Sequence, residues 1–311
     1  MHIREAHETL RTLGFHPQFI AEGMESFVFA VRDSRLAKVW IAKQAIEVRQ
    51  LQSFYAQLRQ VKLPFLTPLI SEVLEAPGGL AVSIEERLPG VPLRDVLEVQ
   101  RNSAVVTNKG LAVVAEVVEA LSAVRGISSA RELNVLGEGV LWAGNRSWGE
   151  VLTDLINRRV NRYKHILARH VIDLEAKVDV VRSRLGLLDT RQIGIIHGDI
   201  CTPNVLVDEN TFTPTALIDF GFLTTAADPL FDAVISALIF DMYSPTAHVT
   251  RRALYETYAQ KWGEQFVNLY PLYKTSYALI TSNAYSEKGE DGHFKWCVDI
   301  LNDTETKSLI N

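Results

Sequence analysis

The stretch IIHGDICTPNVLV at residues 195–207, followed by ALIDFG at residues 216–221, decides the fold of this chain. The residues that form its pattern are His197, Gly198, Asp199, Asn204 and Asp219. Taken singly, an aspartate beside a glycine or an asparagine before a strand is typical of a turn or a cap. Together they form H-G-D-x-x-x-x-N followed by I-D-F-G, and chance explains that order poorly. We therefore interpret them as parts of one site.

Three short apolar runs surround these residues. The run from Ile193 to Ile196 predicts a buried strand that ends at His197. Two further runs, 205–207 and 216–218, predict a pair of strands joined by a polar turn. The loop and strand-end positions of the polar residues then bring Asp199, Asn204 and Asp219 to one pocket.

The residue types match the needs of phosphoryl transfer, which demands positioning more than covalent chemistry. An aspartate has to orient the attacking hydroxyl, and oxygen ligands have to hold Mg²⁺ against phosphates. We expect Asp199 to be the catalytic base and Asn204 and Asp219 to be the metal ligands. We expect His197 to support the loop rather than to transfer a proton.

Protein kinases carry the related patterns H-R-D-x-x-x-x-N and D-F-G, and this chain has Gly198 in place of the arginine. In this form the pattern resembles the aminoglycoside phosphotransferase family, which comprises small-molecule kinases with a protein-kinase-like fold. The resemblance implies an α+β, bilobal protein: an N-terminal nucleotide-binding lobe over residues 1–88 and a mainly helical lobe over residues 89–311. It also implies ATP or GTP and Mg²⁺ as cofactors.

Composition agrees with an ordinary globular protein. The chain has 311 residues, of which 47% are hydrophobic and 22% charged, enough for two lobes. Its net charge of −5 argues against a nucleic-acid partner. Cys201 and Cys297 are too few for a disulfide framework and indicate free thiols. The polar N-terminus and the lack of an apolar run of about 18 residues predict a cytoplasmic protein with no membrane partner. The oligomeric state is not predicted.

The first lobe is expected to be a small antiparallel five-stranded sheet with one helix. The expected strands are 15–20, 27–31, 36–40, 70–74 and 80–84, and the expected helix is 43–58. The loop between the first two strands contains Gly23 and Ser26, whose backbone and hydroxyl can bond phosphate oxygens. A plain hairpin turn is the alternative there.

Lys38 lies in the apolar strand LAKVW, where a lysine is either on the solvent face, which is the commoner case, or held inward by an anion. The following helix has an apolar stripe that includes Leu51, and Glu47 precedes Leu51 by one turn. A buried carboxylate needs a cation, so we expect Glu47 to pair with Lys38 at the nucleotide phosphates. Glu25 is the alternative partner.

The segment EERLPGVPL at residues 85–93 contains two prolines and a glycine, which interrupt regular structure. It occupies the position of the hinge in the family that the chain resembles. By that resemblance, the Glu86 carbonyl and the Leu88 N–H contact the nucleotide base.

In the second lobe, we expect helices from residue 107 or 108 to 125, from 148 to about 169, and a further one that ends near 186. The segment 157–169 is rich in Arg and Lys, and we interpret it as a solvated face rather than an anion site. Only residues 222–227 separate D-F-G from Asp228, which leaves no room for the peptide platform of a protein kinase. Asp228 and Asp232 match an acidic motif of the family, with a mainly architectural role.

These features predict an ATP- or GTP-dependent O-phosphotransferase that acts on a hydroxyl of a small molecule, an aminoglycoside-like or other antibiotic. A kinase of another hydroxyl metabolite, such as choline or a sugar, is the alternative. A protein kinase and a non-catalytic nucleotide-binding module are less favoured. The acidic segment with Glu287, Glu290 and Asp291 is either a site for a cationic acceptor or a solvated turn.

Overall fold

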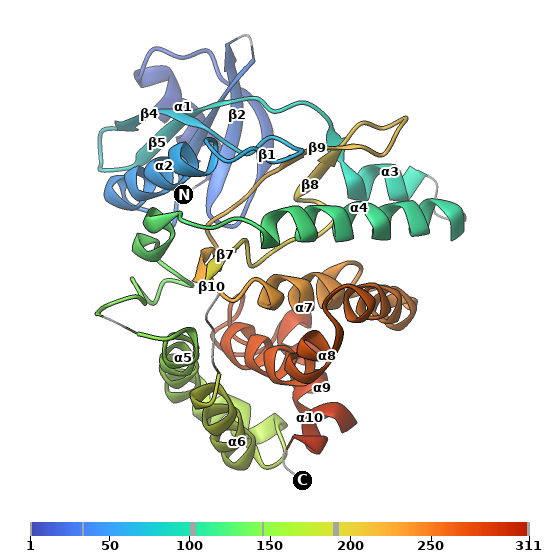
Figure 1. Ribbon diagram of the computed structural model, residues 1–311. Helices are drawn as coiled ribbons and strands as arrows, with labels where there is room; N and C mark the ends of the chain where they lie inside the picture. The colour runs from blue at the N-terminus through green and yellow to red at the C-terminus, as the bar shows by residue number, and fades with distance from the viewer. Residues whose placement is uncertain (1, 33, 100–103, 145, 189–192, 310–311) are drawn as a thin grey trace.

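The computed structural model describes residues 2–309 except 33, 100–103, 145 and 189–192. The chain folds into a sheet-containing lobe above a larger helical lobe (Figure 1). This arrangement confirms the predicted α+β, bilobal, protein-kinase-like fold. Within the described ranges, no helix combines the length and apolar character needed to cross a membrane.

The helices are α1 Ile3–Thr12, α2 Ala45–Leu58, α3 Leu93–Val99, α4 Ala104–Ser122, α5 Trp148–His170, α6 Leu174–Gly186, α7 Leu230–Ile239, α8 Ala247–Thr281, α9 Gly292–Asn302 and α10 Thr304–Ser308. A 3-10 turn covers Ser128–Glu132. The strands are β1 Gln18–Glu22, β2 Ser26–Arg32, β3 Arg35–Trp40, β4 Ile70–Glu75, β5 Ala81–Glu86, β6 Val91–Pro92, β7 Gly194–Ile196, β8 Val205–Val207, β9 Pro214–Leu217 and β10 Thr225–Ala227.

The N-terminal lobe contains a five-stranded sheet in the order β1-β2-β3-β5-β4. All neighbouring strands in it are antiparallel, as the sequence predicted. Side chains alternate between its two faces. Ala37 and Val39 of β3 belong to the small core beneath α1, whereas Trp40 belongs to the large core that contains α2.

The structure adds a second helix, α1, to the single helix predicted for this lobe. Only Ala6 and Leu10 of α1 are buried, and the segment is polar on average. A capping box starts the helix, in which the backbone N–H of His2 donates to Glu5 Oε2 at 2.8 Å. Ile3, Ala6 and Leu10 follow the spacing of one helix face, so the sequence contains a signal for this helix, which packs on the outer face of the sheet.

The two lobes share backbone contacts and one hydrophobic core. Leu66, from the loop before β4, donates its N–H to Thr215 O at 2.9 Å and accepts from Leu217 N at 3.0 Å. The buried residues of α2 belong to the same core cluster as those of α5 and α7. The division between residues 88 and 89 stays a prediction.

Short sheets between the lobes carry the motif residues. β7 pairs with β10, and β8 lies between β6 and β9 (Figure 1). The predicted strand pair at 205–207 and 216–218 is present with a small shift, as β8 and β9. Below them, α7 is buried along its whole length. A capping box at Ser147 starts α5, with Glu150 N donating to Ser147 Oγ at 3.2 Å.

Candidate active site

His197 lies at the end of β7 and is fully buried. Its Nδ1 accepts from the backbone N–H of Asp199 at 3.1 Å, and Nε2 is 2.9 Å from the Ile218 carbonyl oxygen. Nδ1 is thus the acceptor and Nε2–H the donor. Burial lowers the pKa of His197 to about 4, so the imidazole is neutral. These bonds join the loop to β9 and agree with the supporting role predicted for His197.

Gly198 explains why this chain departs from the protein-kinase pattern. Its φ is +82°, a conformation that side chains disfavour. A Cβ at this position would lie 2.3 Å from Leu223 Cβ, so neither arginine nor alanine fits. A glycine is therefore required by the backbone path around residues 197–199.

Asp232 of α7 anchors the same loop from below. Its carboxylate accepts the N–H of His197 at 2.6 Å and the N–H of Gly198 at 2.7 Å. Burial raises the pKa of Asp232 to about 7. Asp228 accepts from Leu230 N at 2.9 Å and from the Tyr273 hydroxyl at 2.8 Å. Both aspartates therefore hold backbone and helix positions, which is the architectural role expected of them.

The structure brings Asp199, Asn204 and Asp219 together. The Asn204 amide nitrogen donates to Asp199 O and to Asp199 Oδ2, both at 2.9 Å. The Asn204 carbonyl accepts from Ile218 N, also at 2.9 Å, so the loop is tied to the residue before Asp219. Asp219 has a φ of +68°, a strained conformation of the kind that clusters at functional sites.

The surroundings of Asp199 shift the pKa of its carboxyl group. Burial raises the pKa of Asp199 to about 7, and the nearby charge of Asp219 adds to this effect. The hydrogen bond from Asn204 acts in the opposite direction. A carboxylate with a pKa near neutrality is suited to accept a proton from a hydroxyl.

The donor set fits a magnesium ion that is shared with a nucleotide. Within the described residues, no group of three or more His, Cys, Asp or Glu side chains is arranged to hold a metal by itself. Mg²⁺ in kinases commonly uses one or two protein oxygens together with phosphate oxygens. The Asn204 nitrogen is engaged by Asp199, which leaves its amide oxygen and the Asp219 carboxylate as ligands.

Lys38 pairs with Glu85 of β5 instead of Glu47. The Nζ–Oε2 distance is 3.2 Å, and the two side chains are 13% and 4% exposed. Ser83, which lies opposite Lys38 in the sheet, donates to Glu85 Oε1 at 2.8 Å. Burial lowers the pKa of Lys38, but Glu85 and Asp219 outweigh it and raise the pKa, so the lysine is charged.

The predicted pairing of Lys38 with Glu47 is therefore wrong. Glu47 is the third residue of α2, and its carboxylate accepts from Gln44 N at 2.8 Å and Asn134 Nδ2 at 2.6 Å. It is occupied in starting the helix and in holding a loop of the second lobe. The alternative partner, Glu25, is engaged by Lys43.

The predicted nucleotide loop is a tight turn between β1 and β2. The N–H of Gly23 donates to Ser26 O at 2.9 Å, and Ser26 is buried. At the predicted hinge, the side chain of Glu86 pairs with Arg59 at 3.0 Å. Contacts of Gly23 and Ser26 with phosphates, and of Glu86 and Leu88 with the base, stay predictions.

A cavity of about 410 Å³ opens beside these groups. Its lining residues come from both lobes: Met24, Glu25, Ala42, Leu136, Gly137, Arg159, Phe222, Ala284 and Tyr285. Burial raises the pKa of Tyr285, and the charge of Asp199 raises it further. Tyr285, and with it this part of the cavity lining, therefore lies near the catalytic loop.

The acidic segment lies outside this lining. Asp291 caps α9 by accepting from Phe294 N at 2.8 Å, and Glu287 and Glu290 are exposed. For these three residues the structure favours the solvated turn over a cationic subsite.

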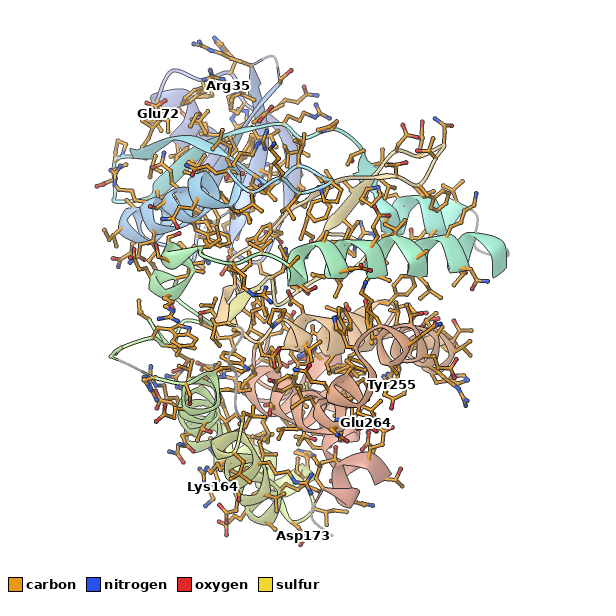
Figure 2. The ribbon with its side chains drawn as sticks, viewed as in Figure 1. Arg35, Glu72, Lys164, Asp173, Tyr255 and Glu264 are labelled. Carbon is orange, nitrogen blue, oxygen red and sulfur yellow. The ribbon has the colours of Figure 1, made fainter. Side chains whose placement is uncertain are left out.

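The charged residues of α5 are mostly engaged in ion pairs. Arg158 pairs with Asp154 at 2.7 Å, and Lys164 pairs with Glu175 at 2.5 Å. Figure 2 shows Lys164 near the lower end of the helical lobe, away from the N-terminal sheet. Arg159 differs from the other charged residues of α5 in its exposure, because it is buried and lines the cavity. The predicted solvated face is present, with Arg159 turned inward.

The sequence profile of the phosphotransferase enzyme family, abbreviated APH, matches residues 17–272. The chain belongs to this family. The match confirms the predicted family and the predicted enzyme class, a small-molecule kinase. No functionally curated protein matches the sequence of this phosphotransferase significantly.

Solved structures of aminoglycoside phosphotransferases share the fold of this family member. One is a thermostable mutant of APH(4)-Ia in a ternary complex with AMP-PNP and hygromycin B, with 16% identity, a TM-score of 0.66, and 95% of this chain and 93% of that chain covered. Another is the GDP complex of wild-type aminoglycoside 2'-phosphotransferase-IIIa, with 16% identity, a TM-score of 0.62, and 99% of each chain covered. A third is APH(3'')-Id from Streptomyces rimosus with ADP and streptomycin, with 18% identity, a TM-score of 0.57, and 89% and 98% covered.

Proposed function

We propose that this phosphotransferase transfers the terminal phosphoryl group of ATP or GTP to a hydroxyl of a small molecule, an antibiotic of the aminoglycoside or another class. The observation that carries the proposal is the half-buried Asp199, hydrogen-bonded to Asn204 and within the electrostatic reach of Asp219. The cavity next to it supplies space for an acceptor.

In the proposed reaction, the acceptor oxygen forms a bond to the γ-phosphorus. The bond between that phosphorus and the β–γ bridging oxygen breaks, and ADP or GDP leaves. The acceptor proton moves to Asp199. Asn204 and Asp219 are positioned to hold Mg²⁺, which neutralises phosphate charge when bound. Lys38, fixed by Glu85, contributes a further positive charge.

The solved structures support both substrates of this proposal by analogy. The similar phosphotransferases carry AMP-PNP, ADP or GDP, which supports nucleotide binding and leaves ATP and GTP as alternatives. Two of them carry hygromycin B or streptomycin, which supports an antibiotic as acceptor.

The cavity favours a second acceptor class, a hydroxylated metabolite with an apolar body. Leu136, Phe222 and Tyr285 are among its lining residues. Of the charged lining residues, Glu25 pairs with Lys43 and Arg159 pairs with Glu138 at 3.4 Å. Acceptors should therefore be screened beyond the polycationic aminoglycosides.

The test is a screen of antibiotics and hydroxyl metabolites for nucleotide consumption, with mass detection of the phosphorylated product. With the acceptor found, Asp199→Asn should lower kcat by about 10²- to 10⁴-fold because the base is lost. Nucleotide affinity should be retained. Asp208→Asn is the matched control, since Asp208 is an exposed turn residue that accepts from Thr211 N at 2.9 Å. Full turnover in the Asp199 variant would exclude it as base, and phosphate found only on protein would indicate a protein kinase.

A further inference from the structure

Lys43 lies between β3 and α2 and points at the loop between β1 and β2. Its Nζ is 2.5 Å from Glu25 Oε1 in that loop. The backbone of the same segments is joined as well, because Ile41 N donates to the Glu25 carbonyl at 2.8 Å. The ion pair therefore closes the β1–β2 loop onto the residues that follow β3.

This ion pair also lies against the D-F-G segment. A Cβ placed on Gly221 would be 3.7 Å from Lys43 Nζ and 3.6 Å from Glu25 Oε2. Gly221 follows the metal-ligand candidate Asp219 by two residues. Lys43 is thus within a few ångströms of the segment that we propose to hold the nucleotide's metal.

Lys43 shares this space with Lys38. The Nζ atoms of the two lysines lie over the same Trp40 ring, at 5.6 Å and 5.7 Å from its centroid. Lys38 is committed to Glu85, whereas Lys43 is held by Glu25. The proposed phosphate region therefore contains a second, largely buried cation that none of the sequence motifs includes.

The two members of the pair differ in their access to water. The Lys43 side chain is 11% exposed, and the Glu25 side chain is 31% exposed. Incoming phosphates repel the carboxylate and attract the ammonium group. Glu25 can turn into solvent at lower cost than Lys43, because it already contacts water. The carboxylate, rather than the lysine, is the group that should leave.

We propose that Lys43 is a second phosphate-binding lysine, which Glu25 holds in place until a nucleotide arrives. Lys43 Nζ then exchanges Glu25 for an oxygen of the terminal phosphate. The exchange is electrostatic, and Lys43 forms no covalent bond. This inference rests on the proposed nucleotide site and assigns to it a residue that the motifs do not contain.

The experiment measures the affinity of the full-length protein for AMP-PNP with Mg²⁺ by calorimetric titration, without an acceptor. Lys43→Gln should weaken AMP-PNP binding about tenfold or more, because a charged hydrogen bond to phosphate is lost. Glu25→Gln should bind AMP-PNP equally or more tightly, because the competing carboxylate is gone. A purely structural ion pair predicts the same direction of change for both variants.

A second readout compares AMP-PNP with ADP, which lacks the terminal phosphate. Lys43→Gln should weaken AMP-PNP binding more than ADP binding, and Lys43→Arg should restore most of the difference. Glu75→Gln is the matched control, because it removes the exposed Glu75–Arg49 ion pair of the same lobe. This control should leave both affinities unchanged.

Equal losses of affinity for AMP-PNP and ADP in Lys43→Gln would overturn the inference, and so would weaker AMP-PNP binding in Glu25→Gln. If Lys43→Gln does not fold, Glu25→Gln decides alone, with weaker AMP-PNP binding counting against the inference. If the wild-type protein does not bind AMP-PNP, the same titrations use GMP-PNP and GDP in place of AMP-PNP and ADP. A wild-type protein that binds neither AMP-PNP nor GMP-PNP would overturn the proposed function and this inference together. Normal wild-type binding with no change in any variant would overturn only the role of Lys43.

Discussion

At the scale of single residues, the backbone conformation around the catalytic loop restricts which amino acids can occupy individual positions. Gly198 combines a φ of +82° with a neighbour that would overlap any Cβ. Asp219 adopts a φ of +68° although it is not glycine. Such strain persists only where surrounding bonds enforce it. Here the hydrogen bonds of Asp232, His197 and Asn204 supply that enforcement.

Gly198→Ala tests the steric argument. Gly126 is the matched control, because it has a φ of +79° and open space at its Cβ position. Gly126→Ala should cost about 1–2 kcal/mol of unfolding free energy from backbone strain alone. Gly198→Ala should cost about 1–3 kcal/mol more because of the overlap with Leu223. Urea unfolding measures both, and equal costs would show that the loop accommodates the methyl group.

The pKa of Asp199 predicts how activity depends on pH. Burial raises this pKa to about 7, so the carboxyl group becomes protonated as the pH falls through neutrality. A protonated base cannot accept the acceptor's proton, and kcat/KM should decrease on the acid side. Mg²⁺ near Asp219 removes part of the shift, while burial remains. Steady-state rates from about pH 5 to about pH 9 should show a midpoint above the ordinary aspartate range and no higher than about 7.

At the scale of secondary-structure elements, strand register decides which carboxylate meets Lys38. The pairing of β3 with β5 sets Ser83 opposite Lys38, and Glu85 follows two residues later on the same face. The start of α2, in contrast, uses Glu47 for its own capping box. The lysine partner is therefore a strand residue in this protein.

Glu85→Gln and Glu47→Gln separate these two roles. Without Glu85, the pKa of Lys38 should fall and its ammonium group should lose the partner that positions it, so AMP-PNP affinity should fall about tenfold. Glu47→Gln should lower stability by about 0.5–2 kcal/mol through the weakened helix start, with a smaller effect on affinity. Titration with AMP-PNP and urea unfolding measure the two effects. A larger affinity loss in Glu47→Gln would restore Glu47 as the functional partner.

At the scale of the whole molecule, the two lobes are joined by one core. Buried residues of α2 and of the helical lobe form a single cluster, and Leu66 pairs with β9 across the division between the lobes. Only the smaller cluster beneath α1 belongs to the N-terminal lobe alone. We therefore expect the lobes to unfold together.

Scanning calorimetry should show one unfolding transition that AMP-PNP with Mg²⁺ shifts to higher temperature. Ligand binding to the folded state alone stabilises by about 2.7 kcal/mol at a ligand concentration of 100 Kd. The whole transition should move, because the proposed nucleotide site draws residues from both lobes. Two transitions, of which only one responds to AMP-PNP, would show that the lobes unfold independently.

The sequence by itself determined the features that depend on nearby residues. Alternating apolar residues predicted the five strands, and the segment 193–221 predicted the meeting of Asp199, Asn204 and Asp219, because short strands and tight turns bring them together locally. Only the tertiary structure decided the partner of Lys38, the anchoring by Asp232 and the placement of Lys43 beside Gly221. It also revealed α1, a short helix in a segment that is polar on average. These contacts join distant segments, and they depend on strand register and helix packing, which short-range sequence patterns do not encode.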